Sequence, residues 1–275
     1  MTFDRGVVFV LFKYAVYVLL AMNVYWFFVE EYGAALVEYP GGVPFAELSV
    51  AYVATIDTAA WVVLLLLFEL ETYLLDDRHF TRPVTLTLHG LRIVCYAFIV
   101  SAFIDYIQSL LFVRAVAPLA GIGDLCVLAA DGWSYAVSLD EYVPVTAGNC
   151  ATLSPAESFL RFEHVRAVVD AGGHAAIMGL AWIDVINSGV WLLVVLVLEI
   201  DVRLQERELL EGWALKLSTA TKVVLYSTLL YAAVYWGIKG SFVDFWDAFL
   251  WLVAFVFIEL NVFEWRAEER EAKSA

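Results

Sequence analysis

The sequence predicts an all-α membrane protein in which six transmembrane helices form three repeated helical hairpins. Hydrophobic residues make up 63% of the 275-residue chain, and the mean hydropathy is +0.79. Several apolar runs reach the length of about eighteen residues or more that indicates a membrane helix. A pattern of tryptophans and acids also recurs in every second run, which indicates an internal repeat.

Six apolar segments use most of the chain. The first follows Arg5 and continues to Phe28, well beyond the apolar region of a signal peptide, so we predict an uncleaved helix. A helix rises ~1.5 Å per residue and the hydrocarbon core is ~30 Å thick, so each segment is long enough to cross. We predict membrane spans at residues 6–29, 48–70, 91–113, 175–198, 219–238 and 242–262.

The second, fourth and sixth spans share one template. An Asp or Asn is followed four residues later by Trp, eight residues after that by Glu, and two residues further by another polar residue. The aligned columns are Asp57, Asn187 and Asp247; Trp61, Trp191 and Trp251; Glu69, Glu199 and Glu259; and Glu71, Asp201 and Asn261. The Trp column lies too deep for the usual interfacial belt, so these rings either pack between hairpins or stack on a ligand.

The first, third and fifth spans carry a base four residues before a tyrosine. These pairs are Lys13 and Tyr17, Arg92 and Tyr96, and Lys222 and Tyr226. Each hairpin therefore joins a basic helix to an acidic one. The predicted boundaries are 1–76 for the first hairpin, 77–205 for the second with an outer loop at 114–173, and 206–275 for the third and a cytoplasmic tail.

The bases and the first acids lie at similar depth in helices of opposite direction. Isolated charges in hydrocarbon cost roughly 2.5–3.5 kcal/mol each, so pairing is expected. We predict three buried ion pairs, one in each hairpin: Lys13 with Glu69, Arg92 with Glu199, and Lys222 with Glu259. The second polar residue of each template points about 200° away from the first. Glu71, Asp201 and Asn261 therefore either project into water or line an inner vestibule or a subunit contact.

A second polar layer, in the other half of the bundle, has no matching bases. Its acids are Asp57, Asp105, Asp184 and Asp247. Intramembrane carboxylates without basic partners either hydrogen-bond to nearby Tyr and Trp side chains or take up protons and cations. The second possibility makes these four acids the predicted path for a cation or a proton.

The loop at 114–173 contains Cys126 and Cys150. In an oxidising compartment they are expected to form a disulfide, and two separate thiols are the alternative. No paired Cys or His spacing typical of a zinc site accompanies them. Further on, Ser154, Pro155 and Glu157 form a helix-capping signature before apolar residues at helical spacing, which predicts a short amphipathic helix.

Lys and Arg residues are concentrated on one predicted side of the membrane. We therefore predict a multi-pass protein of the cell (inner) membrane with both termini cytoplasmic and the long loop outside. The net charge of −15 argues against a nucleic-acid partner. No catalytic or nucleotide-binding motif is present, so we predict no enzymatic activity and no cofactor.

These features predict a transporter or channel for a cation or proton, surrounded by lipid and acting as a homo-oligomer or with other membrane subunits. The alternative is a non-catalytic structural or anchoring subunit of a larger membrane complex. Gly or Pro breaks near the bilayer midplane would favour transport, and few of these residues interrupt the predicted spans. Long apolar faces without a polar lining would favour anchoring.

Overall fold

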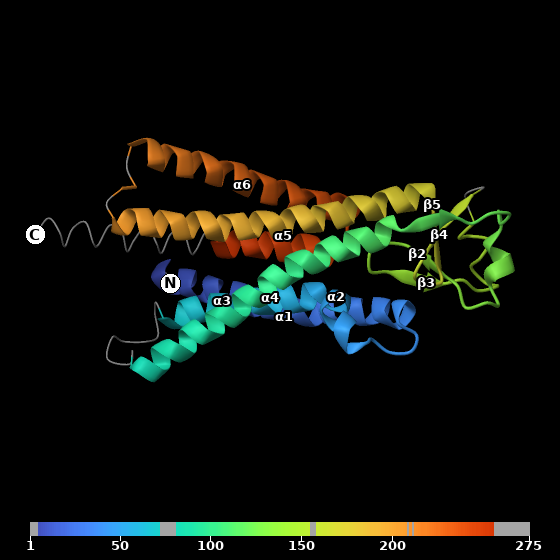
Figure 1. Ribbon diagram of the computed structural model, residues 1–275, viewed down its shortest axis with the longest axis horizontal. Coiled ribbons are helices and arrows are strands. Elements are labelled where there is room, and N and C mark those ends of the chain that lie inside the picture. The colour runs from blue at the N-terminus through green and yellow to red at the C-terminus, as the bar shows by residue number, and fades with distance from the viewer. Residues whose placement is uncertain (1–4, 72–80, 155–157, 208, 211, 256–275) are drawn as a thin grey trace, which may run out of the picture.

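The protein is a long bundle of helices with a small β-sheet at one end (Figure 1). A computed structural model describes residues 5–71, 81–154, 158–207, 209–210 and 212–255. The helical elements are α1 (Arg5–Glu38), η1 (Phe45–Glu47), α2 (Leu48–Ala51), α3 (Val53–Glu69), α4 (Arg82–Arg114), η4 (Leu125–Leu128), α5 (Ala171–Glu206) and α6 (Gly212–Lys239). Residues 242–255 form a further helix, which we call the final helix.

The described helices have the length and apolar surface of membrane spans. Four segments qualify, namely Phe9–Glu38, Arg82–Arg114, Ala171–Asp201 and Gly212–Lys239, and the bent pair of α2 and α3 would be a fifth. Large apolar side chains such as Val18, Ile93 and Val223 face outward. Soluble proteins rarely expose large continuous apolar surfaces. The architecture is thus compatible with the predicted membrane class, while residues 256–262 of the sixth predicted span lie outside the described residues.

The second predicted span is bent near the sheet end. α2 and α3 meet at Tyr52, where φ is −130° and ψ is 38°, and their axes differ by 73°. The Glu31 carboxylate of α1 accepts hydrogen bonds from the amides of Ala54 at 2.6 Å and Thr55 at 3.1 Å. Because first-turn amides lack partners within their own helix, Glu31 stabilises the new start of α3. Neither Gly nor Pro marks this bend in the sequence, which is why a straight helix was expected.

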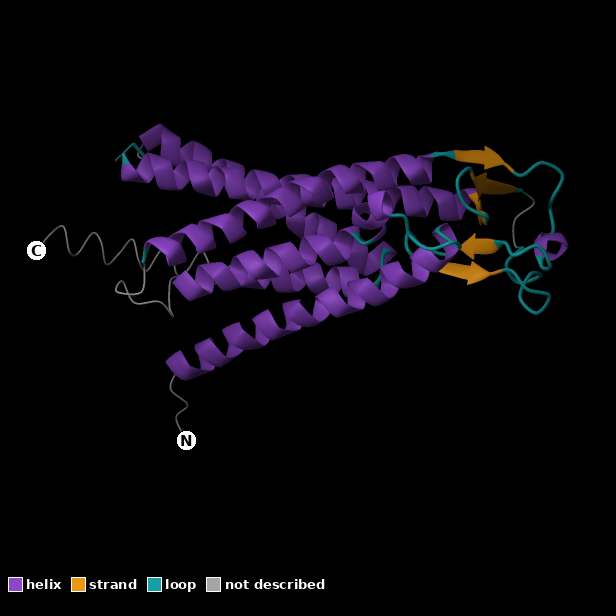
Figure 2. Ribbon diagram, turned by 60° about the horizontal axis from the view of Figure 1, so that its bottom comes forward, coloured by secondary structure: helices purple, strands orange, loops and turns teal. Residues whose placement is uncertain are grey.

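The long loop folds into a five-stranded sheet, whose strands lie at one end of the bundle in Figure 2. The strands are β1 (Val116–Pro118), β2 (Ser134–Ala136), β3 (Tyr142–Pro144), β4 (Phe159–Phe162) and β5 (Ala167–Asp170). Their order is β1-β4-β5-β2-β3, and of the pairs only β2 with β5 is parallel. The sheet covers the bundle end where α4 stops and α5 begins.

The predicted amphipathic helix in this loop is wrong. Phe159 and Phe162, whose spacing suggested a helix, lie in β4 and are both buried, in two different apolar clusters. Residues three apart point to opposite faces of a strand, so both faces of this sheet are covered. β5 supports this conclusion. Its consecutive residues Ala167, Val168 and Val169 are all buried, and a strand that is covered on both faces has such a continuous apolar run.

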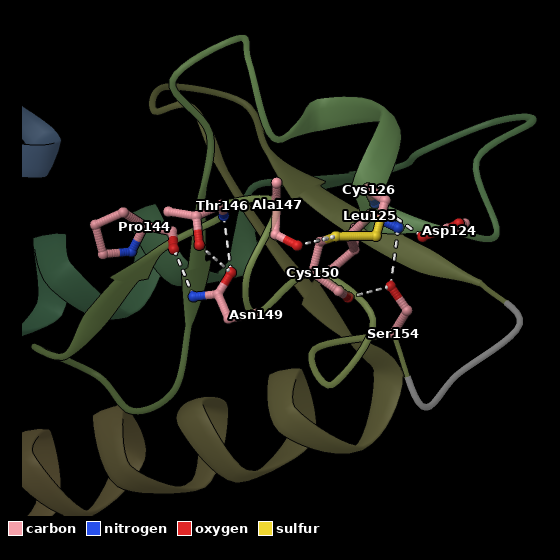
Figure 3. Close-up of a disulfide and its surroundings, with 9 residues drawn as sticks. All are labelled: Asp124, Leu125, Cys126, Pro144, Thr146, Ala147, Asn149, Cys150 and Ser154. Carbon is pink, nitrogen blue, oxygen red and sulfur yellow. Dashed lines mark hydrogen bonds between the residues drawn. A yellow bond between two sulfur atoms is a disulfide. The ribbon is translucent and has the colours of Figure 1, made fainter.

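Cys126 and Cys150 form the predicted disulfide (Figure 3). Ser154, which was expected to cap a helix, lies beside this bridge. Its hydroxyl accepts a hydrogen bond from the amide of Leu125 at 2.9 Å and donates one to the carbonyl of Cys150 at 2.7 Å. The disulfide and these bonds tie together the two ends of the segment that contains β2 and β3.

A tyrosine–carboxylate contact holds the sheet to the bundle. The Tyr135 hydroxyl donates to Asp170 Oδ2 at 2.5 Å, and Asp170 also accepts from the amides of Gly172 and Gly173 at the start of α5. The hydrogen bond from Tyr135 has the largest effect on the pKa of Asp170 and lowers it, and the hydrogen bond from the Gly173 amide lowers it further. Partial burial and Asp170 raise the pKa of Tyr135 to about 12.

Replacing Tyr135 with phenylalanine is expected to change the pH profile of stability. The lowered pKa of Asp170 stabilises the fold above pH ~4, and this stabilisation is lost as the pH falls through that pKa. The raised pKa of Tyr135 stabilises the fold below pH ~10, and this stabilisation is lost as the pH rises towards ~12. The variant should lose about 1 kcal/mol at neutral pH and should lack the alkaline step. Thermal melts between pH 3 and 12 measure this, with the exposed Tyr231→Phe as the control. The same fall in melting temperature above pH ~10 in Tyr135→Phe and in the unmodified protein would contradict this prediction.

Candidate functional site

Charged side chains pair in a layer at the bundle end remote from the sheet, which we call the ion-pair layer. Lys13 Nζ of α1 lies 2.6 Å from Glu69 Oε1 of α3, and both side chains are almost fully buried, at 5% and 3% exposure. Glu69 also accepts from the hydroxyls of Tyr14 at 3.0 Å and Tyr17 at 3.4 Å. The structure therefore brings together the two residues that the sequence assigned to the first hairpin.

The pairing predicted for the second hairpin is not observed. Arg92 of α4 forms its ion pair with Glu71, two residues beyond the end of α3. Glu199, its expected partner, is exposed and contacts Arg203 at 2.8 Å on its own helix. The reason is geometric: Glu69 and Glu71 point in directions about 200° apart, so α3 reaches α1 with the first acid and α4 with the second.

The third base follows the same shifted pattern. Lys222 Nζ of α6 lies 2.7 Å from Asp201 Oδ2 of α5, and Ser218 donates to the same oxygen at 2.7 Å. Its expected partner Glu259 lies outside the described residues, as does Asn261. Glu71 and Asp201 thus each pair with a base on a neighbouring helix, a role that differs from the predicted projection into water, inner vestibule or subunit contact. In both cases the second acid of one hairpin pairs with the base of the next.

The three template tryptophans meet at the centre of the bundle. The ring centroid of Trp61 on α3 lies 5.9 Å from that of Trp191 on α5 and 6.2 Å from that of Trp251 on the final helix. They belong to the main apolar core together with Leu20 and Leu229. Three positions that the sequence template aligns therefore converge in space.

A cavity of about 300 Å³ lies on the sheet side of these tryptophans, and all three rings line it. Helices α1 to α6, the final helix and the turn between β2 and β3 contribute to its wall. Its acidic lining residues are Glu30, Glu31, Glu38, Glu47, Asp57, Asp140, Asp184, Asp244 and Asp247. Among the described residues that line it there is no Lys, Arg or His. We call it the acidic cavity.

Three of the four acids predicted for an ion path line this cavity. Asp184 accepts from the Trp236 indole at 3.2 Å, and Asp247 accepts from Asn23 at 2.8 Å. Asp57 Oδ1 is shielded from solvent and has no hydrogen-bond partner in the part of the chain that the structure describes. Asp105 is not among the lining residues: it is buried on α4, where it accepts from Gln108 at 3.0 Å.

Sequence reasoning missed the acids that α1 supplies. The predicted span ended at residue 29, whereas α1 continues to Glu38 and places Glu30, Glu31 and Glu38 at the cavity. The acids looked like the interfacial end of a span. The signal that could have found them is the spacing of Glu31, Ala34, Ala35 and Glu38, which all lie on one helix face; the two alanines are buried.

The β2–β3 turn lies at the sheet side of the acidic cavity. Leu139 packs against the apolar cluster of Leu180 and Trp236, and Asp140 lines the cavity. Tyr142 of β3 donates to Glu38 of α1 at 2.8 Å, which joins this turn to the bundle. Partial burial and the Glu38 carboxylate raise the pKa of Tyr142, so its phenol remains a donor. A second cavity of about 310 Å³ shares Leu139 and Asp140 with the first.

The acids of the cavity do not form a compact metal centre. Within the described residues, no group of three or more His, Cys, Asp or Glu side chains is placed to hold a metal ion. Most of the carboxylates bond instead to neutral donors, as Glu38, Asp184 and Asp247 do. What the arrangement can do is attract positive charge into a space between helices. No protein-family model, curated protein or solved structure matches this chain.

Proposed function

We propose that the protein is a six-span membrane transporter or channel that takes up a cation or a proton in the acidic cavity. In this proposal the final helix completes the third hairpin. The sheet faces the outside of the cell membrane and both termini are cytoplasmic, as the distribution of Lys and Arg favours. The proposal predicts no enzymatic activity.

The charge of the cavity wall is the observation that carries this proposal. Nine carboxylates line it, and no described lining residue is basic. Carboxylates crowded between apolar helices repel one another and lose the solvation that water provides. Their charge must therefore be neutralised by protons or by bound cations, which is what an ion path requires.

The bend between α2 and α3 places the start of a helix at the wall of the acidic cavity. It is not one of the midplane breaks that are typical of transporters, and its first amides are bonded to Glu31. Here Val53 and Ala54, in the first turn of α3, line the acidic cavity beside Glu31. The interruption lies at the sheet end of the span, so a ligand would meet it on entering from that side.

Cation flux into liposomes that contain the purified protein tests the proposal. We expect flux under a proton, sodium, potassium or calcium gradient, and we expect Asp57→Asn to reduce it at least about tenfold, because one charge-assisted contact contributes about 1.5–3 kcal/mol. Asp105→Asn is the matched control: this acid also lies within a span, but it does not line the cavity.

Equal loss of flux in both variants would point to a folding effect and would remove Asp57 from the path. No flux under any gradient in the folded protein would contradict transport of these ions. The remaining explanation would then be a structural or anchoring subunit, and proteins that co-purify from native membrane would identify its complex.

A further inference from the structure

The wall of the acidic cavity is aromatic as well as acidic. Four indoles line it, those of Trp61, Trp191, Trp236 and Trp251. The electron-rich face of an indole attracts organic ammonium groups, and aromatic walls are the usual surroundings of such ligands in proteins.

The carboxylates are spread through the cavity rather than gathered at one point. A calcium ion takes six to eight oxygen ligands in one shell, whereas no group of three or more acids in the described chain is placed to hold a metal. Along α1 alone, Glu31 and Glu38 are separated by seven residues, or ~10 Å of helix. Separated negative charges fit a ligand whose positive charges are also separated.

Asp57 marks the deep end of this charge distribution. It precedes Trp61 by four residues, or about one helical turn, and its Oδ1 lacks a hydrogen-bond partner among the described residues. A buried carboxylate oxygen is rarely left unsatisfied in a folded protein. A ligand with an N–H donor and a positive charge would satisfy it while resting against the indole.

We propose that the ligand of the acidic cavity is a linear organic cation with two or more ammonium groups joined by methylene chains, that is, a diamine or polyamine. One ammonium group binds Asp57 against Trp61, the methylene chain lies along the aromatic wall, and a second ammonium group reaches acids nearer the sheet such as Glu38. The volume of about 300 Å³ accommodates a ligand of this size. This inference rests on the proposed function, because it presupposes that the cavity binds cations.

Calorimetric titration of the full chain in lipid nanodiscs tests the ligand class. The probes are spermidine, 1,4-diaminobutane, n-butylamine, sodium and calcium. We expect both multivalent amines to bind, with n-butylamine about tenfold weaker because it forms one charge-assisted contact instead of two. Binding should also shift the tryptophan fluorescence, since the indoles line the site.

Variants locate the binding site. Asp57→Asn should weaken spermidine binding at least about tenfold, and Trp61→Leu about tenfold through loss of the indole face. Asp105→Asn should leave the affinity unchanged. If Trp61→Leu does not fold, two measurements still test the proposal. They are the difference in spermidine affinity between Asp57→Asn and Asp105→Asn, and the ratio of the diaminobutane and butylamine affinities of the unmodified protein.

The outcomes separate the two proposals. Sodium or calcium binding that depends on Asp57, without amine binding, would overturn the amine assignment and leave the proposed cation site intact. Equal affinities for butylamine and diaminobutane would overturn the two-point contact. Absence of binding by all five probes would overturn the amine assignment. The flux measurement under proton and potassium gradients would then decide the proposed function separately.

Discussion

Replacing Glu69 with glutamine is expected to lower the free energy of unfolding by about 3–5 kcal/mol, the usual result of removing one partner of a buried ion pair. Glu69 faces the ammonium group of Lys13 at 2.6 Å, and both side chains are almost fully buried. The substitution keeps the size of the side chain but removes its charge, so Lys13 loses its ion pair with this carboxylate. Unfolding by denaturant, followed by tryptophan fluorescence, measures the change.

The double variant tests whether the loss comes from this pair. Adding Lys13→Gln to Glu69→Gln should recover part of the lost stability, because the buried ammonium group that lost its pair with Glu69 is then removed as well. Glu199→Gln is the matched control, since its contact with Arg203 is exposed on one helix and should contribute less than about 0.5 kcal/mol. Strictly additive losses from the two single substitutions would exclude coupling between Lys13 and Glu69.

Removal of the disulfide is expected to have the second-largest effect. Cys126 and Cys150 are 24 residues apart, and in the chain-entropy account a loop of that length contributes about 3 kcal/mol. The loss should be confined to the sheet and to the β2–β3 turn beside the acidic cavity. Proteolysis or hydrogen exchange of the loop at 114–173, in the protein with both cysteines replaced by serine, measures it.

Cys95→Ser provides the comparison for the disulfide. Cys95 is a buried free thiol within α4, so its replacement controls for the loss of a sulfur atom without a loss of a cross-link. If the loop resists proteolysis and hydrogen exchange equally in Cys95→Ser and in the variant without the disulfide, hydrogen bonds and apolar packing alone hold the sheet. Labelling of Cys126 and Cys150 by an alkylating reagent without reductant would contradict the bridge itself.

Features that depend on composition and local spacing could be predicted from the sequence. Apolar length indicates the membrane helices, and two cysteines in one loop predict their bridge. The alignment of Trp61, Trp191 and Trp251 identified equivalent positions, and these rings meet in the structure. The pairing of Lys13 with Glu69 follows from similar depth in neighbouring antiparallel helices.

Features that depend on which helices are neighbours could not be predicted. Arg92 pairs with Glu71 of the preceding hairpin because α3 lies between α1 and α4, and depth alone does not specify this. The loop was misread because Phe159 and Phe162 fit both a helix face and two faces of a buried strand. Asp140 reaches the acidic cavity only because the sheet folds its turn back onto the bundle.

The ion-pair layer has a mechanical consequence for any movement of the bundle. It ties α1 to α3, α3 to α4, and α5 to α6 at the end remote from the sheet. Helices fastened at one end can pivot apart only at the other, and there the acidic cavity lies. In the proposed transporter, a ligand would therefore exchange on the sheet side first. Release to the opposite end would require at least one of these tied contacts to separate, which would make them part of the barrier to passage.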